Sequence, residues 1–517
     1  MASTGATDVT TSHSTSSIAQ ALHARDRDSI LLADEHGTLS TQDVIRFTER
    51  FVEALTTARL PPHPRLAVVL PNGRLLAVTA VAAMSSATFA PLDPRLAAPE
   101  FEVLLEHLGA DALVSAAGFS PGAHEAARRR GLPILDADRA GDWEVTSLGT
   151  SRRPRDEDGS PVALLLHTSG TTARPKLVGL SAENLTSSAR SIAATIDVDP
   201  ADRCLNVMPL FHIHGLVGVL LTSLVAGASV HTTERFDPFV FARTLRDPQI
   251  SWTSAVPSMY NALLVRSRGE FVAPGLRLAR SSSAPLPASL GNHLETLLDC
   301  PVINSYGMTE ASHQMASNPV PPSERRHGTV GRSAGAEVAI LRGDTVTAGA
   351  GTLGEVVVRG PGLMERYLAP DEANDTAWHG DWFRTGDLGS LDAEGYLTLH
   401  GRIKEIINVA GEKVSPYEVE AVLLDHPSVA DVAVFGAPDR LRGEQVCAVV
   451  VPKQHSEPPT PAQLRDHATE RLAAFKAPRR FVIAESIPLG PTGKIQRSLL
   501  AERFGLDSLD STPAVSD

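Results

Sequence analysis

The chain has 517 residues, 42% of them hydrophobic, and a formal net charge of −13 at pH 7. The length exceeds that of one ordinary domain, and the acidic balance argues against a nucleic-acid-binding role, which needs a basic surface to neutralise phosphates. The three cysteines, Cys204, Cys300 and Cys447, show no metal-ligand spacing, so we expect buried thiols in a reducing compartment.

The two ends of the chain and one long apolar run bear on its location. Residues 1–15 are rich in Ser and Thr and lack the apolar core of a secretory signal, so we expect a disordered leader. Residues 215–230 are interrupted by Thr, Ser and three glycines, which favours a buried helix over a membrane span. We expect a cytoplasmic protein with no membrane span, and a disordered tail at residues 508–517.

Short aliphatic runs alternate with helical patterns from residue 16 onward. Residues 65–71 and 162–167 have the composition of buried strands, and residues 75–84 have that of a helix. Such alternation predicts an α/β fold with parallel sheets and helices on their faces. Half-exposed strand patterns at residues 354–359 and 396–400 follow, so we expect a large N-terminal domain over residues 16–401.

The sequence pattern changes at residues 402–404. A charged turn, a short strand and a glycine loop lead to a helix that begins near Ser415 and Pro416, and Pro is favoured in a first helical turn. Two strand patterns and an amphipathic helix over residues 461–475 follow. We therefore expect a small α+β domain over residues 405–507, joined to the first domain by a hinge at residues 402–404.

The first of three polar segments with candidate chemistry is LLLHTSGTTARPKLV, at residues 164–178. A buried strand runs into a Ser/Thr/Gly loop that ends at Pro175 and Lys176. Hydroxyl and backbone N–H groups of such a loop bind phosphates, and a lysine adds charge. The spacing is not that of a Walker A loop. A polar surface turn would explain the Ser/Thr/Gly run alone, but the preceding strand and the lysine favour phosphate binding.

The second segment is NSYGMTEASH, at residues 304–313. Tyr306 offers a flat face for a purine, Thr309 a hydroxyl, and Glu310 an oxygen ligand for Mg²⁺. Capping of a helix N-terminus would also explain Thr309 and Glu310.

The third segment is DWFRTGDLG, at residues 381–389, and GRIKE follows at residues 401–405. Asp387 could accept hydrogen bonds from ribose hydroxyls, although a simple β-turn explains an Asp there equally well. Arg402 is a candidate contact for ribose or phosphate.

Lysine is rare, since only six of the 47 Lys and Arg residues are Lys. Arg replaces Lys at little cost on a solvated surface, but not where a compact point charge must fit a tight site. The segment PTGKIQR at residues 491–497 nevertheless keeps Lys494. We therefore treat Lys494 as a candidate functional residue.

Taken in order, TSGTTARPK, YGMTE, TGDLG, GRIKE and PTGKIQR resemble the motifs of the adenylate-forming superfamily of acyl-CoA synthetases, adenylation domains and luciferases. The resemblance covers about residues 16–505. It implies a large domain of packed sheets and helices with a β-barrel-like subdomain, followed by a small mobile domain. It also implies two half-reactions. A carboxylate attacks the α-phosphorus of Mg·ATP to give an acyl-adenylate and pyrophosphate, and a thiol, usually of coenzyme A, then displaces AMP.

The resemblance assigns roles to the matching residues. ATP binding is implied for Thr168, Ser169, Gly170, Thr171, Thr172, Lys176 and Thr309 at the phosphates, Tyr306 at adenine, and Asp387 and Arg402 at the ribose. Glu310 is the implied Mg²⁺ ligand, Lys404 the hinge and Gly411 a residue of the thiol tunnel. Lys494 enters the site for adenylation only, where an ammonium offsets the negative charge that builds between the carboxylate and the α-phosphate.

Some positions depart from the family pattern. Ala173 and Leu177 in the phosphate loop, and Arg366 further on, stand where the family favours Gly. We expect the two loop changes to be tolerated because the phosphate-facing groups remain. Val409 and Ala410 stand where related ligases often have Arg-Gly, which affects the details of CoA binding.

Three residues converge on the implied acid pocket. The segment PLFHIHG, at residues 209–215, matches a family motif whose first His, here His212, lies beside the acyl carboxylate. Ser283 and His313 stand where many relatives carry small or apolar residues. Each has an ordinary explanation, since His212 is common in the family, Ser283 could bond to backbone and His313 could be a satisfied core histidine. Together they would be left unpaired against an alkyl or aryl tail, at about 1–3 kcal/mol each, whereas a second carboxylate would pair with them.

The segments around these three residues look most like those of the oxalate–CoA ligases of plants and fungi. We therefore expect a monomer or homodimer that forms oxalyl-CoA, AMP and pyrophosphate from oxalate, ATP and CoA. The chain ends in TPAVSD and not in a Ser-Lys-Leu type peroxisomal signal.

Several alternatives remain open at this point. One is a CoA ligase for a medium-chain or aromatic acid. Another is a relative that activates a different small acid, such as nitrite, and passes it to an amine. A non-catalytic AMP-binding module is disfavoured by Lys494 and Glu310. An amino-acid adenylation domain is disfavoured because PLFHIHG contains no Asp to hold an α-ammonium.

Overall fold

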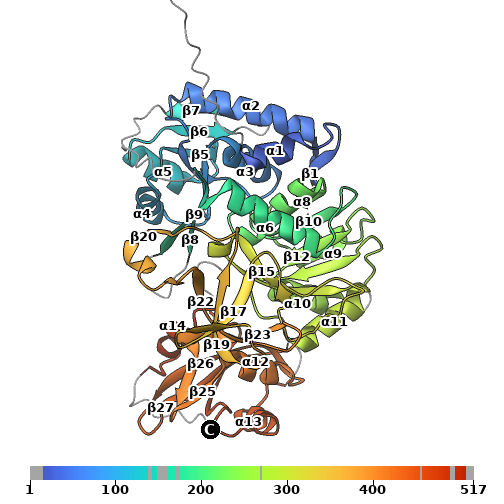
Figure 1. Ribbon diagram of the computed structural model, residues 1–517, viewed down its shortest axis with the longest axis vertical. Helices are drawn as coiled ribbons and strands as arrows, with labels where there is room; N and C mark the ends of the chain where they lie inside the picture. The colour runs from blue at the N-terminus through green and yellow to red at the C-terminus, as the bar shows by residue number, and fades with distance from the viewer. Residues whose placement is uncertain are drawn as a thin grey trace, which may run out of the picture.

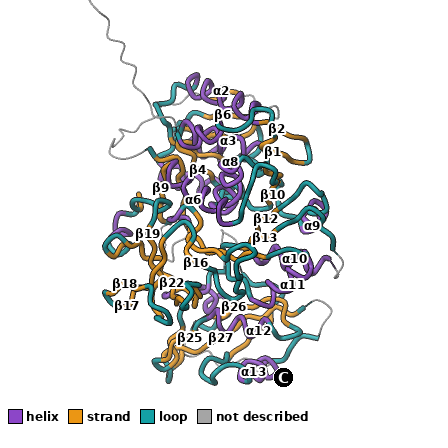
Figure 2. The backbone as a smooth tube through the Cα atoms, turned by 45° about the vertical axis from the view of Figure 1, so that its right-hand side comes forward, coloured by secondary structure: helices purple, strands orange, loops and turns teal. Residues whose placement is uncertain are grey.

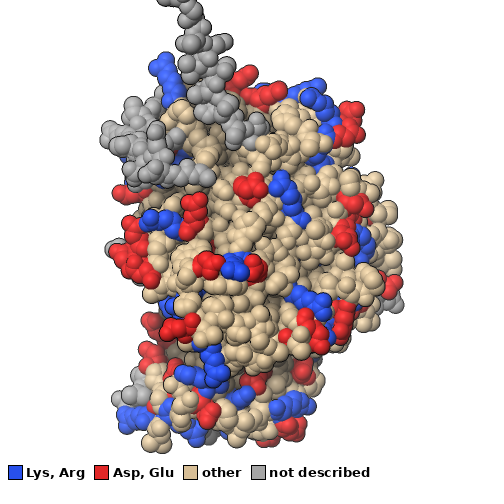
Figure 3. Space-filling model, viewed as in Figure 1, with Lys and Arg blue, Asp and Glu red and all other residues tan. Residues whose placement is uncertain are grey.

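The structure is a computed structural model that describes residues 16–137, 143–147, 161–168, 175–267, 271–453, 457–488 and 495–507. The expected leader at residues 1–15 and tail at residues 508–517 lie outside the described residues. Figure 1 shows a large N-terminal part, coloured blue to yellow, and a smaller C-terminal part, coloured orange to red, at its lower end. On the face in Figure 3, basic and acidic side chains are interspersed, in keeping with the acidic net charge.

The first sheet has nine strands in the order β16-β15-β14-β13-β12-β10-β11-β1-β2. Its central strands, from β14 to β1, run parallel to one another, and the strands outside them pair antiparallel. The bounds are β1 Ile30–Asp34, β2 Gly37–Ser40, β10 Arg203–Asn206, β11 Ser229–Thr232, β12 Trp252–Ala255, β13 Leu278–Ser281, β14 Val302–Met308, β15 His313–Ser317 and β16 Arg332–Ser333.

The second sheet has eight strands in the order β20-β9-β8-β4-β3-β5-β6-β7. Strands β8, β4, β3, β5 and β6 are parallel neighbours, and they read as continuous apolar runs because both faces of the sheet are covered. The bounds are β3 Arg65–Val69, β4 Thr88–Pro91, β5 Ala112–Ala116, β6 Ile134–Ala137, β7 Trp143–Ser147, β8 Val162–Thr168, β9 Lys176–Ser181 and β20 Tyr367–Ala369.

Helices fill the space between these sheets and cover their outer faces. One apolar core joins both sheets to α1, α2, α3, α6 and α8, and α6 and α8 lie side by side in Figures 1 and 2. A second core lies under α4 and α5 and a third under α9, α10 and α11. The bounds are α1 Ser17–His23, α2 Thr41–Thr57, α3 Arg74–Ser86, α4 Ala98–Leu108, α5 Pro121–Arg129, α6 Ala182–Thr195, α9 Pro238–Thr244, α10 Pro257–Ser267 and α11 Ala288–Leu298.

The apolar run at residues 215–230 is a buried helix, as expected, but it ends earlier than the run. It comprises α7 Ile213–Gly215, the π-helical segment η1 Leu216–Leu221 and α8 Thr222–Ala226, and Gly227 ends it in a left-handed conformation with φ 78°. No helix of the described residues is long and apolar enough to cross a membrane. The cysteines Cys204, Cys300 and Cys447 are buried and free, as predicted.

A third, antiparallel sheet follows the two large ones in the chain. Its strands are β17 Glu337–Arg342, β18 Thr345–Thr347, β19 Leu353–Arg359, β21 Trp378–His379, β22 Trp382–Leu391 and β23 Leu397–Arg402, with the short 3-10 helix η3 Asp371–Asn374 before β21. Its inner face joins the first apolar core. This sheet therefore brings β22 and β23 close to the end of β14.

The C-terminal part has its own sheet and core. The 3-10 helix η4 Ile403–Glu405 leads to β24 Ile407–Val409, β25 Glu412–Val414, β26 Val429–Asp439, β27 Gly443–Pro452 and β28 Arg480–Ile483, with α12 Pro416–Leu424, α13 Pro461–Thr469 and α14 Arg497–Arg503. The predicted start of α12 is confirmed, because Ser415 is its N-cap and accepts from the backbone N–H of Glu418. The helix expected over residues 461–475 ends earlier, at Thr469.

Candidate active site

The parallel strands of the first sheet deliver the candidate residues to one edge. Strands β10, β12, β13 and β14 are parallel neighbours, so their carboxyl ends lie together, where ligands bind in open α/β sheets. His212 follows β10, Ser283 follows β13, and Tyr306 lies near the end of β14. His313 returns to the same edge as the first residue of β15, after the 3-10 turn η2 Thr309–Ala311.

The phosphate-loop prediction falls partly outside the described residues, since Ser169, Gly170, Thr171 and Thr172 lie there. The two ends of the loop are described. Thr168 and Lys176 are direct partners across the antiparallel pair β8–β9. The strand register therefore fixes both ends of the segment beside each other.

Lys176 and Glu310 both contact Tyr367, a residue that the sequence analysis did not identify. The Lys176 Nζ lies 4.2 Å from the centroid of the Tyr367 ring, and the Tyr367 hydroxyl donates to Glu310 Oε1 at 2.9 Å. Burial lowers the pKa of Lys176, Glu310 opposes that shift, and the positive charges of Lys404 and Arg402 add to it. Three cations and a buried carboxylate thus lie close enough to influence one another, as a polyphosphate site requires.

Tyr306, Asp387 and Arg402 form a second group. The Tyr306 hydroxyl donates to Asp387 Oδ2, and Arg402 Nε lies 2.8 Å from Asp387 Oδ1. Asp387 and Arg402 face each other across β22 and β23. Burial and the neighbouring Asp387 carboxylate both raise the pKa of Tyr306, so its hydroxyl keeps its proton. Burial disfavours the charged form of Arg402, but the Asp387 carboxylate favours that form more strongly. The pKa of Arg402 is therefore raised.

The remaining nucleotide, hinge and thiol candidates are placed as follows. Thr309 begins η2, directly before Glu310. Lys404 lies in η4, where the chain leaves the third sheet. Gly411 and Ala410 form the turn between β24 and β25, with φ of 93° and 54°, a left-handed pair typical of tight hairpins. Lys494 lies outside the described residues.

A third group of polar side chains centres on His214, the second histidine of PLFHIHG. His214 Nδ1 lies 3.0 Å from Ser283 Oγ, its Nε2 lies 2.7 Å from Ser254 Oγ, and its ring stacks on that of His313 with centroids 4.9 Å apart. The sequence named His212, whose ring packs on Phe211 at 4.6 Å. The sequence signal for His214 was that the motif contains two histidines, one on each side of Ile213.

Arg280 completes this cluster and was also missed. It is fully buried on β13 and donates to Ser254 Oγ at 3.3 Å, to His313 Nε2 at 3.1 Å and to Gln314 Oε1 at 3.0 Å. Burial lowers its pKa to about 10. The local sequence contained no signal for its burial, because Arg280 is followed by three serines and Arg is rarely fully buried.

The backbone around the cluster is strained. Ser283, Ser312 and His313 have φ values of 71°, 50° and 97°, in the left-handed region that non-glycine residues seldom adopt. Such residues cost about 1–3 kcal/mol each and gather at ligand sites. Gly218 of η1 packs against the same histidines, since a Cβ on it would lie 2.7 Å from the His313 ring.

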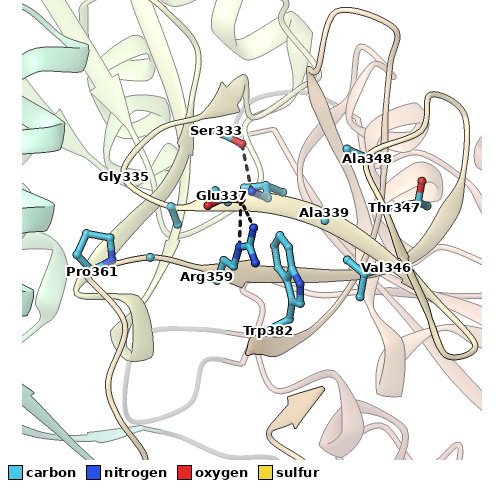
Figure 4. Close-up of a pocket in the computed structure, with 13 residues that line it drawn as sticks. Ser333, Gly335, Glu337, Ala339, Val346, Thr347, Ala348, Arg359, Pro361 and Trp382 are labelled. Carbon is cyan, nitrogen blue, oxygen red and sulfur yellow. Dashed lines mark hydrogen bonds and ion pairs between the residues drawn. The ribbon is translucent and has the colours of Figure 1, made fainter. Parts of the chain in front are cut away.

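A separate groove of about 610 Å³ lies on the third sheet (Figure 4). Arg359 lies 4.5 Å above the Trp382 ring and pairs with Glu337 and Asp381. None of the predicted site residues that the structure describes lines this groove. Its charged groups are paired with one another.

Comparison with known proteins agrees with the motifs and the fold. The AMP-binding enzyme family matches residues 19–368, and the AMP-binding enzyme C-terminal domain matches residues 418–494. The oxalate–CoA ligase of Arabidopsis thaliana is 38% identical over 87% of this chain and 90% of its own length. The sulfoacetate–CoA ligase of Cupriavidus necator is 34% identical over 84% of this chain and 86% of its own.

A solved structure has the same fold. ATP-bound MatB from Rhodopseudomonas palustris superposes with a TM-score of 0.85 at 26% identity, covering 94% of this chain and 98% of that one. The expected mixed α/β architecture, with a large N-terminal and a smaller C-terminal domain, is thereby confirmed. The chain belongs to the AMP-binding enzyme family and is an adenylate-forming acyl-CoA ligase.

Proposed function

We propose that this chain is an oxalate–CoA ligase, which converts oxalate, ATP and CoA into oxalyl-CoA, AMP and pyrophosphate. The observation that carries the proposal is the polar wall at the acid end of the site, made by His214, Ser283 and His313. Polar groups left unpaired against hydrocarbon cost about 1–3 kcal/mol each. A second carboxylate would pair with them, so a dicarboxylate fits this wall better than an alkyl or aryl tail does.

The close packing of η1 supports a short acid. Gly218 touches both histidine rings, since a Cβ on it would lie 2.7 Å from His313 and 3.3 Å from His214. We infer that this packing leaves little room for a longer tail beside the two rings. The name of the Arabidopsis thaliana relative, oxalate–CoA ligase, gives independent support.

We assign the nucleotide to the two groups beside this wall. Tyr306 would stack on adenine, and Asp387 with Arg402 would hold the ribose. The positive charges that act on Lys176 suit the phosphates of ATP. The Tyr367 hydroxyl orients the Glu310 carboxylate, and a single protein carboxylate together with substrate phosphates is a common way to hold Mg²⁺. When bound there, Mg²⁺ offsets phosphate charge.

We also propose that the domain over residues 405–507 turns about the hinge at residues 402–404. In one orientation Lys494 would reach the carboxylate and α-phosphate for adenylation. In the other, Gly411 would line the path of the thiol. A change of orientation supplies a cation to the first half-reaction and removes it from the second.

The substrate is tested by pyrophosphate release with Mg·ATP, with and without CoA, using oxalate, malonate, octanoate and 4-coumarate. We expect oxalate to give the highest kcat/KM, and CoA to yield oxalyl-CoA by mass spectrometry. A higher kcat/KM for octanoate or 4-coumarate would show that the polar wall does not select the acid. Acid-dependent pyrophosphate release with no CoA product would point to an amine acceptor.

The role of Lys494 is tested separately on the two half-reactions. We expect Lys494→Ala to abolish pyrophosphate release while leaving thiolysis of supplied acyl-adenylate largely intact. Equal loss of both steps would contradict the assignment.

A further inference from the structure

Arg280 is a buried cation surrounded by neutral partners. Its side chain is fully buried, and its hydrogen bonds go to a hydroxyl, an imidazole and an amide oxygen, of Ser254, His313 and Gln314. Among the described residues, no carboxylate forms an ion pair with it. Buried charges in proteins are almost always paired, because removing an ion from water is costly unless an opposite charge compensates.

We infer that Arg280 provides the counter-charge for a second negative group on the acid, and so restricts the substrate to short acids with two negative charges. The inference rests on the proposed function and deepens it. It makes Arg280 the residue that distinguishes a distal carboxylate or sulfonate from a neutral group of the same shape. The sulfoacetate–CoA ligase among the relatives acts on an acid of this charge class.

An unpaired polar atom of Arg280 itself supports the inference. Its Nε is buried and has no hydrogen-bond partner among the described residues. Buried polar atoms are normally satisfied, so this N–H indicates a place for a polar ligand beside the guanidinium.

The hydrogen bond to His313 also keeps that ring from sharing the charge. A guanidinium can only donate, so His313 Nε2 accepts and the proton of the ring is on Nδ1. A ring in this form is neutral. The positive charge of the cluster therefore stays on Arg280.

Arg25 shows what a purely structural buried arginine looks like in the same chain. It is also buried, and burial lowers its pKa to about 10. Its guanidinium, however, donates to the backbone carbonyls of Ser223, Leu224 and Ile30. The first two belong to the last turn of α8, where the helix dipole supplies negative charge. None of the hydrogen bonds of Arg280 reaches a backbone carbonyl.

The experiment compares oxalate with oxamate, which has the same shape but one charge fewer. Pyrophosphate release is measured for the wild type, Arg280→Met, Arg280→Lys and Gln314→Glu, with Arg25→Met as a matched control. Gln314→Glu places a carboxylate at the position whose oxygen lies 3.0 Å from Arg280 Nη2, so it neutralises Arg280 without removing it.

We expect Arg280→Met and Gln314→Glu to lower kcat/KM for oxalate on the order of 100-fold, through KM, with the KM for ATP unchanged. The oxalate-to-oxamate ratio should fall close to one in both variants. Arg280→Lys should recover part of the ratio, because it restores the charge without the planar geometry. Arg25→Met should lower thermal stability and leave the ratio as in the wild type.

The outcomes separate this inference from the proposed function. If the wild type prefers oxalate but Gln314→Glu keeps the wild-type ratio, the role of Arg280 is wrong and the proposed function stands. If the wild type rejects oxalate but takes malonate or sulfoacetate, and Arg280→Met removes that activity, the proposed function is wrong and the role of Arg280 stands. Should Arg280→Met fail to fold, Gln314→Glu decides, because it keeps both the arginine and the shape of residue 314.

Discussion

Two arginines in this enzyme that are largely shielded from solvent have opposite surroundings. Arg497, in the C-terminal domain, binds both oxygens of Glu420 at 2.8 and 2.9 Å and lies 3.3 Å from Glu405. Burial opposes its charge, but these two carboxylates raise its pKa. Arg280, in the acid pocket, has neutral partners, and burial lowers its pKa.

The difference separates a structural charge from one that serves a ligand. The ion pairs of Arg497 are complete within the protein and tie α14 to α12 and to η4. Arg280 has no carboxylate partner among the described residues, and we propose that an anion from outside the chain compensates its charge. Burial alone therefore does not identify a functional arginine. The charge of its partners does.

The largest effect is expected from breaking the complete pair. Arg497→Leu leaves Glu420 buried without its counter-charge, and breaking a buried pair in this way costs about 3–5 kcal/mol. Urea denaturation should show this loss in the free energy of unfolding. The double variant Arg497→Leu with Glu420→Leu should recover most of it, because neither charge remains. Equal losses in the single and double variants would show that Arg497 does not act through Glu420.

The second-largest effect is expected from a substitution in η1 that tests how closely this segment packs against the proposed acid pocket. Gly218→Ala would bring a Cβ to within 2.7 Å of the His313 ring, so the ring must move away from Arg280. Displacement of a substrate-positioning group by about 1 Å costs on the order of 100-fold in rate, and we expect that loss in kcat/KM for oxalate. Gly291→Ala is the control, since its Cβ would meet the His327 ring at the same 2.7 Å outside the site. Normal activity in Gly218→Ala would remove the argument for a short acid.

A smaller effect is expected on the nucleotide side. Tyr367→Phe keeps the ring beneath Lys176 and removes the hydrogen bond to Glu310. Hydrogen bonds to charged groups contribute about 1.5–3 kcal/mol, so KM for ATP should rise about tenfold or more, with little change for oxalate. Tyr396→Phe is the matched control, because Tyr396 likewise lies under a cation, Arg326, and its hydroxyl donates to the backbone carbonyl of Glu324. A rise in KM for oxalate instead would place Tyr367 in the acid pocket.

The smallest effect concerns a second complete pair, His124 and Asp136, whose Nε2 and Oδ1 lie 2.8 Å apart. The hydrogen bond that His124 donates to Asp136 raises the pKa of His124, so this contribution to stability is full below pH about 6.5 and is lost as the pH rises. Burial acts to raise the pKa of Asp136, but the hydrogen bond from His124 outweighs it and that pKa is lowered. This contribution is present above pH about 4 and is lost as the pH falls.

The pair is therefore strongest between about pH 4 and 6.5. We expect His124→Asn to lower the free energy of unfolding by roughly 1 kcal/mol more at pH 5.5 than at pH 9. Oxalate kinetics should be unchanged at both pH values, since the pair links α5 to β6 and not to the site. A loss of stability that is the same at both pH values would mean that the pair is not charged.

The nucleotide groups could be found from the sequence because each lies in a short motif of fixed order. Lys176, Glu310, Asp387 and Arg402 stand in four such motifs, and the structure brings them into two adjoining groups. Their pairings follow from strand register. Asp387 meets Arg402 because β22 and β23 are antiparallel neighbours, and a motif does not state its partner strand. Tyr367 was missed for the same reason.

The polar cluster that we propose as the acid pocket was only partly predicted from the sequence. Ser283 and His313 were identified, but the choice between His212 and His214 depends on which ring turns toward β13, and a three-residue helix decides that. Arg280 stands directly before three serines, and nothing in this local sequence indicates that it is fully buried. Its hydrogen-bond partners lie on β12, 26 residues away in the chain, and on β15, at least 33 residues away.

The sequence alone determined the family, the mixed α/β fold and the candidate nucleotide-binding residues, because motifs and periodic apolar patterns are local properties of the chain. Only the tertiary structure decided which polar groups share the acid pocket and which cation there lacks an internal counter-charge. The physical reason is that burial and electrostatic pairing depend on contacts between distant segments. Parallel strands place residues far apart in the chain at one sheet edge, and the compensation of a buried charge is a property of that whole neighbourhood.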